Sequence, residues 1–242
     1  MMPMVMIKKQ SQAIGALARM KLLIACPCHN GKLDNVFALS LVETVDQLAK
    51  AGIDTTILLP PTGSVLTHER NKIISVFMQN TDATHILCID SDMGWDPGIP
   101  LRMLKENRSI IAGCYPARSN LEQKNFLFVP KTNPDGSLVV DKNLIQLNYG
   151  PAGFMMISRK AITTMQAALP ERHFHMVQYD GSILTGTVLF NTEIIDGGAY
   201  IGEDYLFCHL ANQAQVDIWT DPNYVFTHAG TTGALASILL QK

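Results

Sequence analysis

Short apolar segments alternate with amphipathic helical segments between residues 21 and 115, and this alternation limits the fold more than any other feature. In chain order, the predicted segments are strand 21–25, helix 34–50, strand 55–59, helix 64–78, strand 86–89, helix 100–106 and strand 110–114. Such an order is typical of parallel sheets, because each helix carries the chain back across the sheet before the next strand begins. We therefore expect an α/β fold with a doubly wound, mostly parallel, Rossmann-like sheet.

The rest of the chain is less regular but contains no obvious linker. Its expected strands and helices are, in order, 152–157, 159–169, 203–212 and 216–219. Residues 117–148 are predicted to form hairpins or a loop, and residues 171–198 are predicted to be rich in loops. We expect residues 1–19 to be an extension and residues 20–242 to form a single domain.

The composition excludes several classes of protein. Of the 242 residues, 47% are hydrophobic and 17% are charged, and the formal net charge is −2. There is no basic excess of the kind that nucleic-acid binding requires. No apolar stretch approaches the ~20 residues of a membrane span. The five cysteines follow neither a disulfide nor a zinc pattern, so a cytoplasmic location is expected.

Two acids follow the predicted strand 86–89, in the sequence Asp90-Ser91-Asp92. In an extended chain, residues i and i+2 point the same way, about 6.6 Å apart. The carboxyl ends of strands are where open α/β sheets bind ligands. Two neighbouring carboxylates favour a divalent cation with oxygen ligands, itself bound to phosphate. The alternative is a plain turn, in which the acids cap backbone N–H groups.

Three further features follow in the chain: Gly150-Pro151-Ala152-Gly153 before an apolar strand, Glu203-Asp204 at a helix start, and the late His228. Together with the two acids, and in this order, they resemble the GT-A-fold glycosyltransferases, especially the small bacterial and viral types. The resemblance covers residues 21–230 and implies a GT-A-type fold. It also implies an enzyme that moves a sugar from a nucleotide-diphosphate sugar, with a UDP-sugar favoured, to a hydroxyl group.

The resemblance assigns Mn²⁺ or Mg²⁺ as cofactor. Asp92 would bind the metal directly, Asp90 would reach the ribose or a metal-bound water, and His228 would complete the metal shell. An imidazole ligand favours Mn²⁺ over the harder Mg²⁺. His228 could equally be a structural histidine.

Other residues are assigned to the nucleotide-sugar by the same resemblance. They are Pro27, His29, Arg70, Ser91, Tyr115, Arg118, Gly150 and Gly153. The loop with Pro27 and His29 would cradle the nucleotide, and Arg70 would reach the base or phosphates. Gly150 and Gly153 would let a sugar approach the backbone closely. His29 and Arg70 could instead be ordinary surface residues.

The acidic pair Glu203-Asp204 resembles the pair of inverting GT-A enzymes. Asp204 is the first choice for the base that takes a proton from the acceptor hydroxyl, and Glu203 is the second. Both acids could instead only favour the positive end of a helix. In a retaining enzyme, the pair would bind sugar hydroxyls.

Three other functions compete with glycosyl transfer. A sugar nucleotidyltransferase on a similar fold would carry a Gly-rich, Arg-bearing loop after the first strand, which here reads Cys26-Pro27-Cys28-His29-Asn30-Gly31. A phosphoesterase would need more metal ligands. A non-catalytic nucleotide- or sugar-binding module remains open. The acceptor, whether glycan, protein or another hydroxyl compound, is not specified by any motif.

Overall fold

A nine-stranded mixed sheet forms the centre of the molecule. The structure is a computed structural model, and it describes residues 20–62, 65–116, 128–178, 180–228 and 231–235. The strands of the sheet, in spatial order, are β3 (Asp54–Leu58), β1 (Lys21–Ala25), β5 (His85–Ile89), β11 (Phe154–Ser158), β7 (Ile110–Ala112), β16 (Ile218–Thr220), β10 (Leu144–Tyr149) and β8 (Val129–Pro130), with β9 (Val140–Asp141) beside β10. Strands β3, β1 and β5 are parallel, as are β7 and β16. Strand β11 runs antiparallel between β5 and β7, so all five of those strands point the same way.

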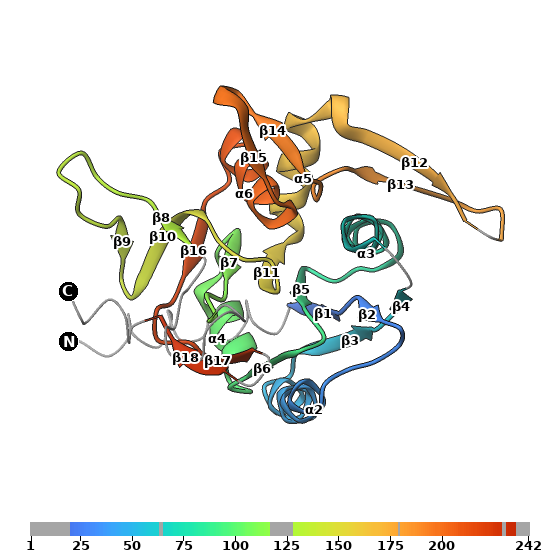
Figure 1. Cartoon of the computed structure of the whole chain (residues 1–242). Helices are drawn as coiled ribbons and strands as arrows, with labels where there is room; N and C mark the ends of the chain where they lie inside the picture. The colour runs from blue at the N-terminus through green and yellow to red at the C-terminus, as the bar shows by residue number, and fades with distance from the viewer. Residues whose placement is uncertain (1–19, 63–64, 117–127, 179, 229–230, 236–242) are drawn as a thin grey trace, which may run out of the picture.

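Helices cover both faces of the sheet (Figure 1). One face packs against α3 (Leu66–Asn80), α5 (Arg159–Ala168) and α6 (Glu203–Gln213), and the other against α2 (Asn35–Lys50) and α4 (Ile99–Glu106). Side chains alternate along each strand, so Leu23 joins the α3 side and Leu22 the α2 side. The predicted α/β, doubly wound, mostly parallel sheet is confirmed.

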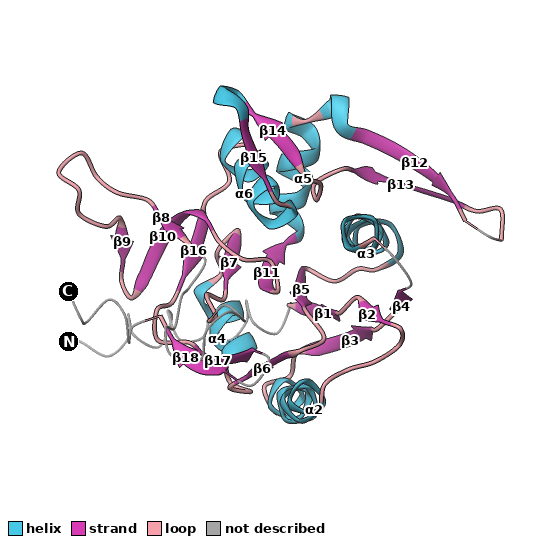
Figure 2. Ribbon diagram, viewed as in Figure 1, coloured by secondary structure: helices cyan, strands magenta, loops and turns pink. Residues whose placement is uncertain are grey.

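Four smaller sheets lie outside the central sheet (Figure 2). They are β2 (Cys28–His29) with β4 (Pro61–Thr62), β12 (His173–Val177) with β13 (Ile183–Thr187), β14 (Glu193–Ile195) with β15 (Ala199–Ile201), and β6 (Met93–Trp95) with β17 (Val225–His228) and β18 (Thr231–Ala234). Single-turn 3₁₀ helices span Pro170–Arg172 and Asp196–Gly198.

The prediction that residues 171–198 are rich in loops is wrong, because most of them form the β12–β13 and β14–β15 hairpins. Along β12 the side chains alternate between exposed and half-buried positions. A strand on the surface of a helix buries only part of one face, so its apolar alternation is weak in sequence.

Helix α3 holds the β12–β13 hairpin and the segment after it. The amide of Gln79 donates to Thr185 Oγ1 at 2.6 Å and accepts from the Thr185 N–H at 2.9 Å. About two helical turns earlier, the amide oxygen of Asn71 accepts the backbone N–H groups of Leu189 and Phe190 at 2.8 and 3.0 Å. These contacts connect α3 to the chain that leads into α6.

Within the described part of the chain, no helix is long and apolar enough to span a membrane. The predicted extension of residues 1–19 lies outside the described residues.

Candidate active site

Most of the predicted site residues gather at the carboxyl edge of the parallel strands. Asp90 follows β5, and Tyr115 follows β7 by three residues. Because β11 is antiparallel, its first residues, after Gly153, lie at the same edge. This is the edge at which open α/β sheets bind ligands.

A buried ion pair lies at the base of the site. Arg70 is only 5% exposed and donates from Nη2 to Asp90 Oδ1 at 2.9 Å and from Nη1 to the Ala152 carbonyl at 3.0 Å. Burial lowers the pKa of Arg70, but the charge of Asp90, together with smaller effects of Tyr115, Cys88 and Glu203, outweighs burial, so the net pKa is raised. Arg70 therefore remains a cation fixed beneath the strand ends.

The two acids after β5 have different partners. Residues 90–93 form a turn, in which the Met93 N–H donates to the Asp90 carbonyl at 3.2 Å. The extended geometry expected from the sequence is therefore wrong, and Asp90 is held by Arg70. The predicted contacts of Asp90 and Ser91 with metal or nucleotide-sugar stay predictions.

Asp92 lies beside His228, although 136 positions separate them in sequence. His228 Nε2 is 3.4 Å from Asp92 Oδ2. Strand β17 pairs with β6 and places His228 opposite Met93, which brings the histidine to the end of the acidic turn. His228 Nδ1 is 2.8 Å from the Pro116 carbonyl, which can only accept, so Nδ1 carries the proton.

This tautomer makes Asp92 and His228 suitable for a cation. In a neutral ring with its proton on Nδ1, Nε2 is the nitrogen that can bind a cation, and Asp92 Oδ2 lies 3.4 Å from it. With a second proton on Nε2, the same two groups form an ion pair instead. Among the described residues, no group of three or more His, Cys, Asp or Glu side chains is arranged to hold a metal ion. A metal here would therefore take its other ligands from water and ligand phosphates, as Mg²⁺ commonly does.

Tyr115 and Gly153 close the inner side of the site. Tyr115 Oη accepts from the Gly153 N–H at 3.1 Å, and its ring lies edge-on to His228 at 4.8 Å between centroids. Burial, and then the charge of Asp90, raise the pKa of Tyr115 well above its usual value. A Cβ on residue 153 would lie 2.2 Å from Tyr115 Oη and 2.6 Å from Asp90 Oδ2.

The structure gives Gly150 a packing role. A Cβ there would lie 3.0 Å from Leu147 Cδ1 and 3.1 Å from the Ala112 Cβ. Its N–H is 3.4 Å from the buried Cys208 Sγ, which itself packs in the core. Close approach of a sugar at Gly150 stays a prediction.

The acidic pair occupies the first turn of α6, as predicted, with Gly202 as N-cap. Both side chains are half-buried. Burial raises the pKa of Glu203, the neighbouring charge of Asp204 raises it further, and Arg70 acts in the opposite direction. Arg70 and Asp90 therefore lie near enough to Glu203 to affect its pKa, and the role of the acidic pair in the site stays a prediction.

The remaining predicted residues are less informative. His29 is exposed on β2, with Nε2 3.0 Å from the Asn30 amide nitrogen, and Pro27 is buried between β1 and β2. Both follow β1 at the same sheet edge, and their contact with a nucleotide stays a prediction. Arg118 lies outside the described residues.

One feature beside the site was not predicted. Tyr149 and Tyr205 stack with ring centroids 5.0 Å apart, and Tyr205 adjoins Asp204. The pair joins β10 to α6 across 56 positions of sequence, and no local pattern connects the two residues.

Comparisons with known proteins give only distant similarity. No family model and no curated protein matches the chain. Among solved structures, A197 from STIV is 14% identical with a TM-score of 0.46, over 86% of this chain and 85% of that one. S. aureus TarS 1–349 is 11% identical with a TM-score of 0.43, over 83% and 58%. The 4-diphosphocytidyl-2C-methyl-D-erythritol synthase from Anaerococcus prevotii is 8% identical with a TM-score of 0.35, over 81% and 99%. We therefore infer function from the site residues.

Proposed function

We propose that this protein is a metal-dependent glycosyltransferase that uses a nucleotide-diphosphate sugar, with a UDP-sugar favoured. The observation that carries the proposal is the approach of His228 Nε2 to Asp92 Oδ2, at 3.4 Å, at the carboxyl edge of the sheet. Mn²⁺ or Mg²⁺ would bind these two residues and neutralise the charge that develops on the leaving diphosphate.

The neighbouring residues fit the remaining tasks of such a site. Arg70 supplies a fixed positive charge, and it also holds Asp90 in one orientation through the 2.9 Å ion pair. Asp90, so fixed, can accept hydrogen bonds from sugar or ribose hydroxyl groups. Tyr115 and Gly153 form a tight wall that positions a ligand against these groups.

The acidic pair of α6 provides the base. Asp204 would take the proton from the attacking acceptor hydroxyl, which gives inversion at the sugar carbon. Glu203 is the second candidate, because its raised pKa keeps it a stronger base than an exposed carboxylate. The acceptor would enter beside α6.

Replacing Asp204 by Asn tests the proposal. The amide keeps the size of the side chain but cannot accept the proton, so turnover should fall by roughly 10²–10⁴-fold while donor affinity is nearly unchanged. Slow hydrolysis of UDP-sugars with Mn²⁺ provides an assay with water as acceptor. Glu203→Gln is measured in parallel. Of the two acids, the base is the one whose replacement causes the larger loss of turnover.

Two results would contradict this mechanism. Equal losses of donor affinity and turnover in Asp204→Asn would make Asp204 a sugar-binding residue of a retaining enzyme. Full activity in both variants would remove the acidic pair from the chemistry.

A further inference from the structure

The stack of Tyr149 and Tyr205 has no role in the proposed mechanism, although it adjoins the acidic pair. Tyr205 follows Asp204 directly in the first turn of α6, and Tyr149 is the last residue of β10. Burial, and then the charge of Asp204, raise the pKa of Tyr205. After burial and the charge of Asp90, Asp204 also contributes to the raised pKa of Tyr115. Asp204 therefore lies near both the inner wall of the site, at Tyr115, and the stack.

The stack is held in place and has a surface that a ligand can reach. Tyr149 packs against the hydrophobic core on the α6 side of the sheet. Tyr205 lies on Tyr149 with ring centroids 5.0 Å apart and an angle of 26° between the rings. Both side chains are only half-buried, so part of the stack is in contact with solvent. A molecule that presents a hydroxyl group to Asp204 can lie against this surface.

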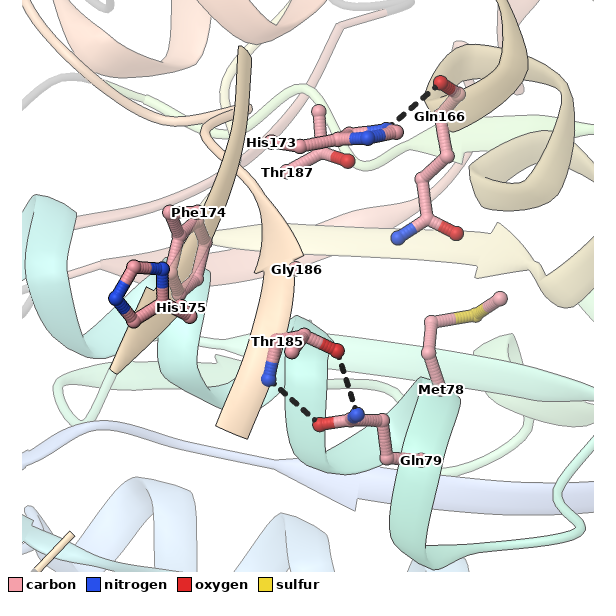
Figure 3. Close-up of a pocket in the computed structure, with 9 residues that line it drawn as sticks. All are labelled: Met78, Gln79, Gln166, His173, Phe174, His175, Thr185, Gly186 and Thr187. Carbon is pink, nitrogen blue, oxygen red and sulfur yellow. Dashed lines mark hydrogen bonds between the residues drawn. The ribbon is translucent and has the colours of Figure 1, made fainter. Parts of the chain in front are cut away.

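The cavity in Figure 3 is not next to the acidic pair. It has a volume of about 610 Å³ and lies between the β12–β13 hairpin, the end of α3 and helix α5. Its residues Met78 and Gln79 follow Arg70 by eight and nine positions, about 12 Å along the axis of α3. Arg70, by contrast, lies near Glu203. An acceptor hydroxyl at Asp204 therefore belongs to a different surface, and the stack is the surface that adjoins this residue.

The groups around the stack select the chemical class of the acceptor. Tyrosine combines a flat apolar ring with a polar hydroxyl group. A sugar ring matches it, because the C–H groups of one sugar face can lie on the aromatic ring while the sugar hydroxyls bond to polar neighbours. The carboxylates of Glu203 and Asp204 repel an anionic acceptor. A nucleic acid would need a basic surface, and the formal net charge is −2.

We propose that Tyr149 and Tyr205 bind a neutral sugar ring of the acceptor and hold one of its hydroxyl groups at Asp204, an inference that rests on the proposed function. In this arrangement the stack positions the acceptor, and the acidic pair performs the chemistry.

Binding of the sugar is tested first, without nucleotide or metal. The full chain, labelled with ¹⁵N, is titrated with the neutral sugars glucose, galactose, maltose and cellobiose, and separately with glucuronate and sorbitol. We expect at least one neutral sugar to shift the amide signals of Tyr149 and Tyr205 in a saturable way. Glucuronate is anionic and sorbitol has no ring, so both should bind at least about tenfold more weakly than that sugar.

Tyr205→Leu is the decisive variant, because it keeps an apolar side chain but removes the flat ring. Loss of the stacking surface should weaken sugar binding by about tenfold. Tyr205→Phe keeps the ring and should bind within about threefold of the original protein. Tyr200→Ala is the matched control, because it removes an exposed tyrosine of β15 outside the stack and should bind as the original protein does. Thermal melts show whether each variant is folded.

Transfer is then tested with UDP-glucose or UDP-galactose and Mn²⁺, where the bound sugar should increase UDP release above the rate with water alone. The proposal is overturned if no neutral sugar shifts the two amide signals, or if glucuronate or sorbitol binds equally well. It is also overturned if folded Tyr205→Leu binds as well as Tyr200→Ala, or if the bound sugar accepts nothing from a UDP-sugar that the protein hydrolyses. A protein that binds the sugar but hydrolyses no UDP-sugar would instead contradict the proposed function, so the two failures are distinguishable.

Discussion

At the scale of single residues, the site depends on a position where a side chain would not fit between its neighbours. Gly153 is the clearest case, since its N–H bonds to Tyr115 Oη at 3.1 Å and a Cβ would lie 2.2 Å from the same atom. The sequence predicted a close approach at Gly153, and the structure brings Tyr115 and Asp90 to this position. The approach of a sugar to Gly153 stays a prediction.

Gly153→Ala should therefore damage both stability and ligand binding. The new methyl group must displace Tyr115 and the Asp90 carboxylate, and such overpacking destabilises by roughly 1–3 kcal/mol. Urea unfolding measures the loss. Tyr115→Phe removes the atom nearest to the methyl group, so the double variant should lose less than the sum of the two single losses. Strictly additive losses would show that the methyl group is accommodated elsewhere.

Glu203 should make stability depend on pH. Burial and the charge of Asp204 raise its pKa in the folded protein, so the folded state binds this proton more tightly than the unfolded state. Proton binding by Glu203 therefore stabilises the folded state. This stabilisation is complete at a pH below the pKa that Glu203 has in the unfolded chain, and it is lost as the pH rises through the pKa of Glu203 in the folded protein. Glu203→Gln should thus be more stable than the original protein at pH 7, and this advantage should shrink as pH falls. Parallel thermal melts across pH 4–8 measure the difference, and a constant difference would contradict it.

At the scale of elements, the strands that are buried on both faces could be predicted from the sequence, while the surface hairpins could not. Strand β5 is buried along its whole length and appears as an unbroken apolar run. Strand β12 rests on α3 and alternates only between exposed and half-buried positions. Residues 90–93 are not extended but form the turn that the sequence left open as the alternative, and this turn leads into β6, which pairs with β17.

Helix α3 carries the longest-range links, and Asn71 should be its most sensitive polar residue. Asn71→Ala leaves the buried N–H groups of Leu189 and Phe190 without an acceptor. We expect the free energy of unfolding to fall by roughly 2–4 kcal/mol. Asn212→Ala removes one exposed bond to the Asn148 carbonyl and should cost less than about 1 kcal/mol. Equal losses in the two variants would show that α3 does not anchor this segment.

At the scale of the whole molecule, the topology assembles a site from segments that are distant in sequence. The acids follow β5, Arg70 comes from α3, the pair Glu203-Asp204 starts α6, and His228 ends β17. The order of the acids, the pair Glu203-Asp204 and His228 was visible in the sequence, because each of these motifs lies at an element boundary. The Arg70–Asp90 pair and the Tyr149–Tyr205 stack were not, since side-chain contacts between elements leave no local pattern.

The most direct test of the central claim is calorimetry of UDP binding in the presence of Mn²⁺. The original protein should bind UDP with Mn²⁺ and much more weakly when EDTA removes the metal. Asp92→Ala should lose the metal-dependent part of the affinity while its melting curve stays cooperative. Asp96→Ala, an exposed acid on the same segment paired with Arg102, is the matched control and should bind as the original protein does. Unchanged metal-dependent affinity in Asp92→Ala would contradict the account.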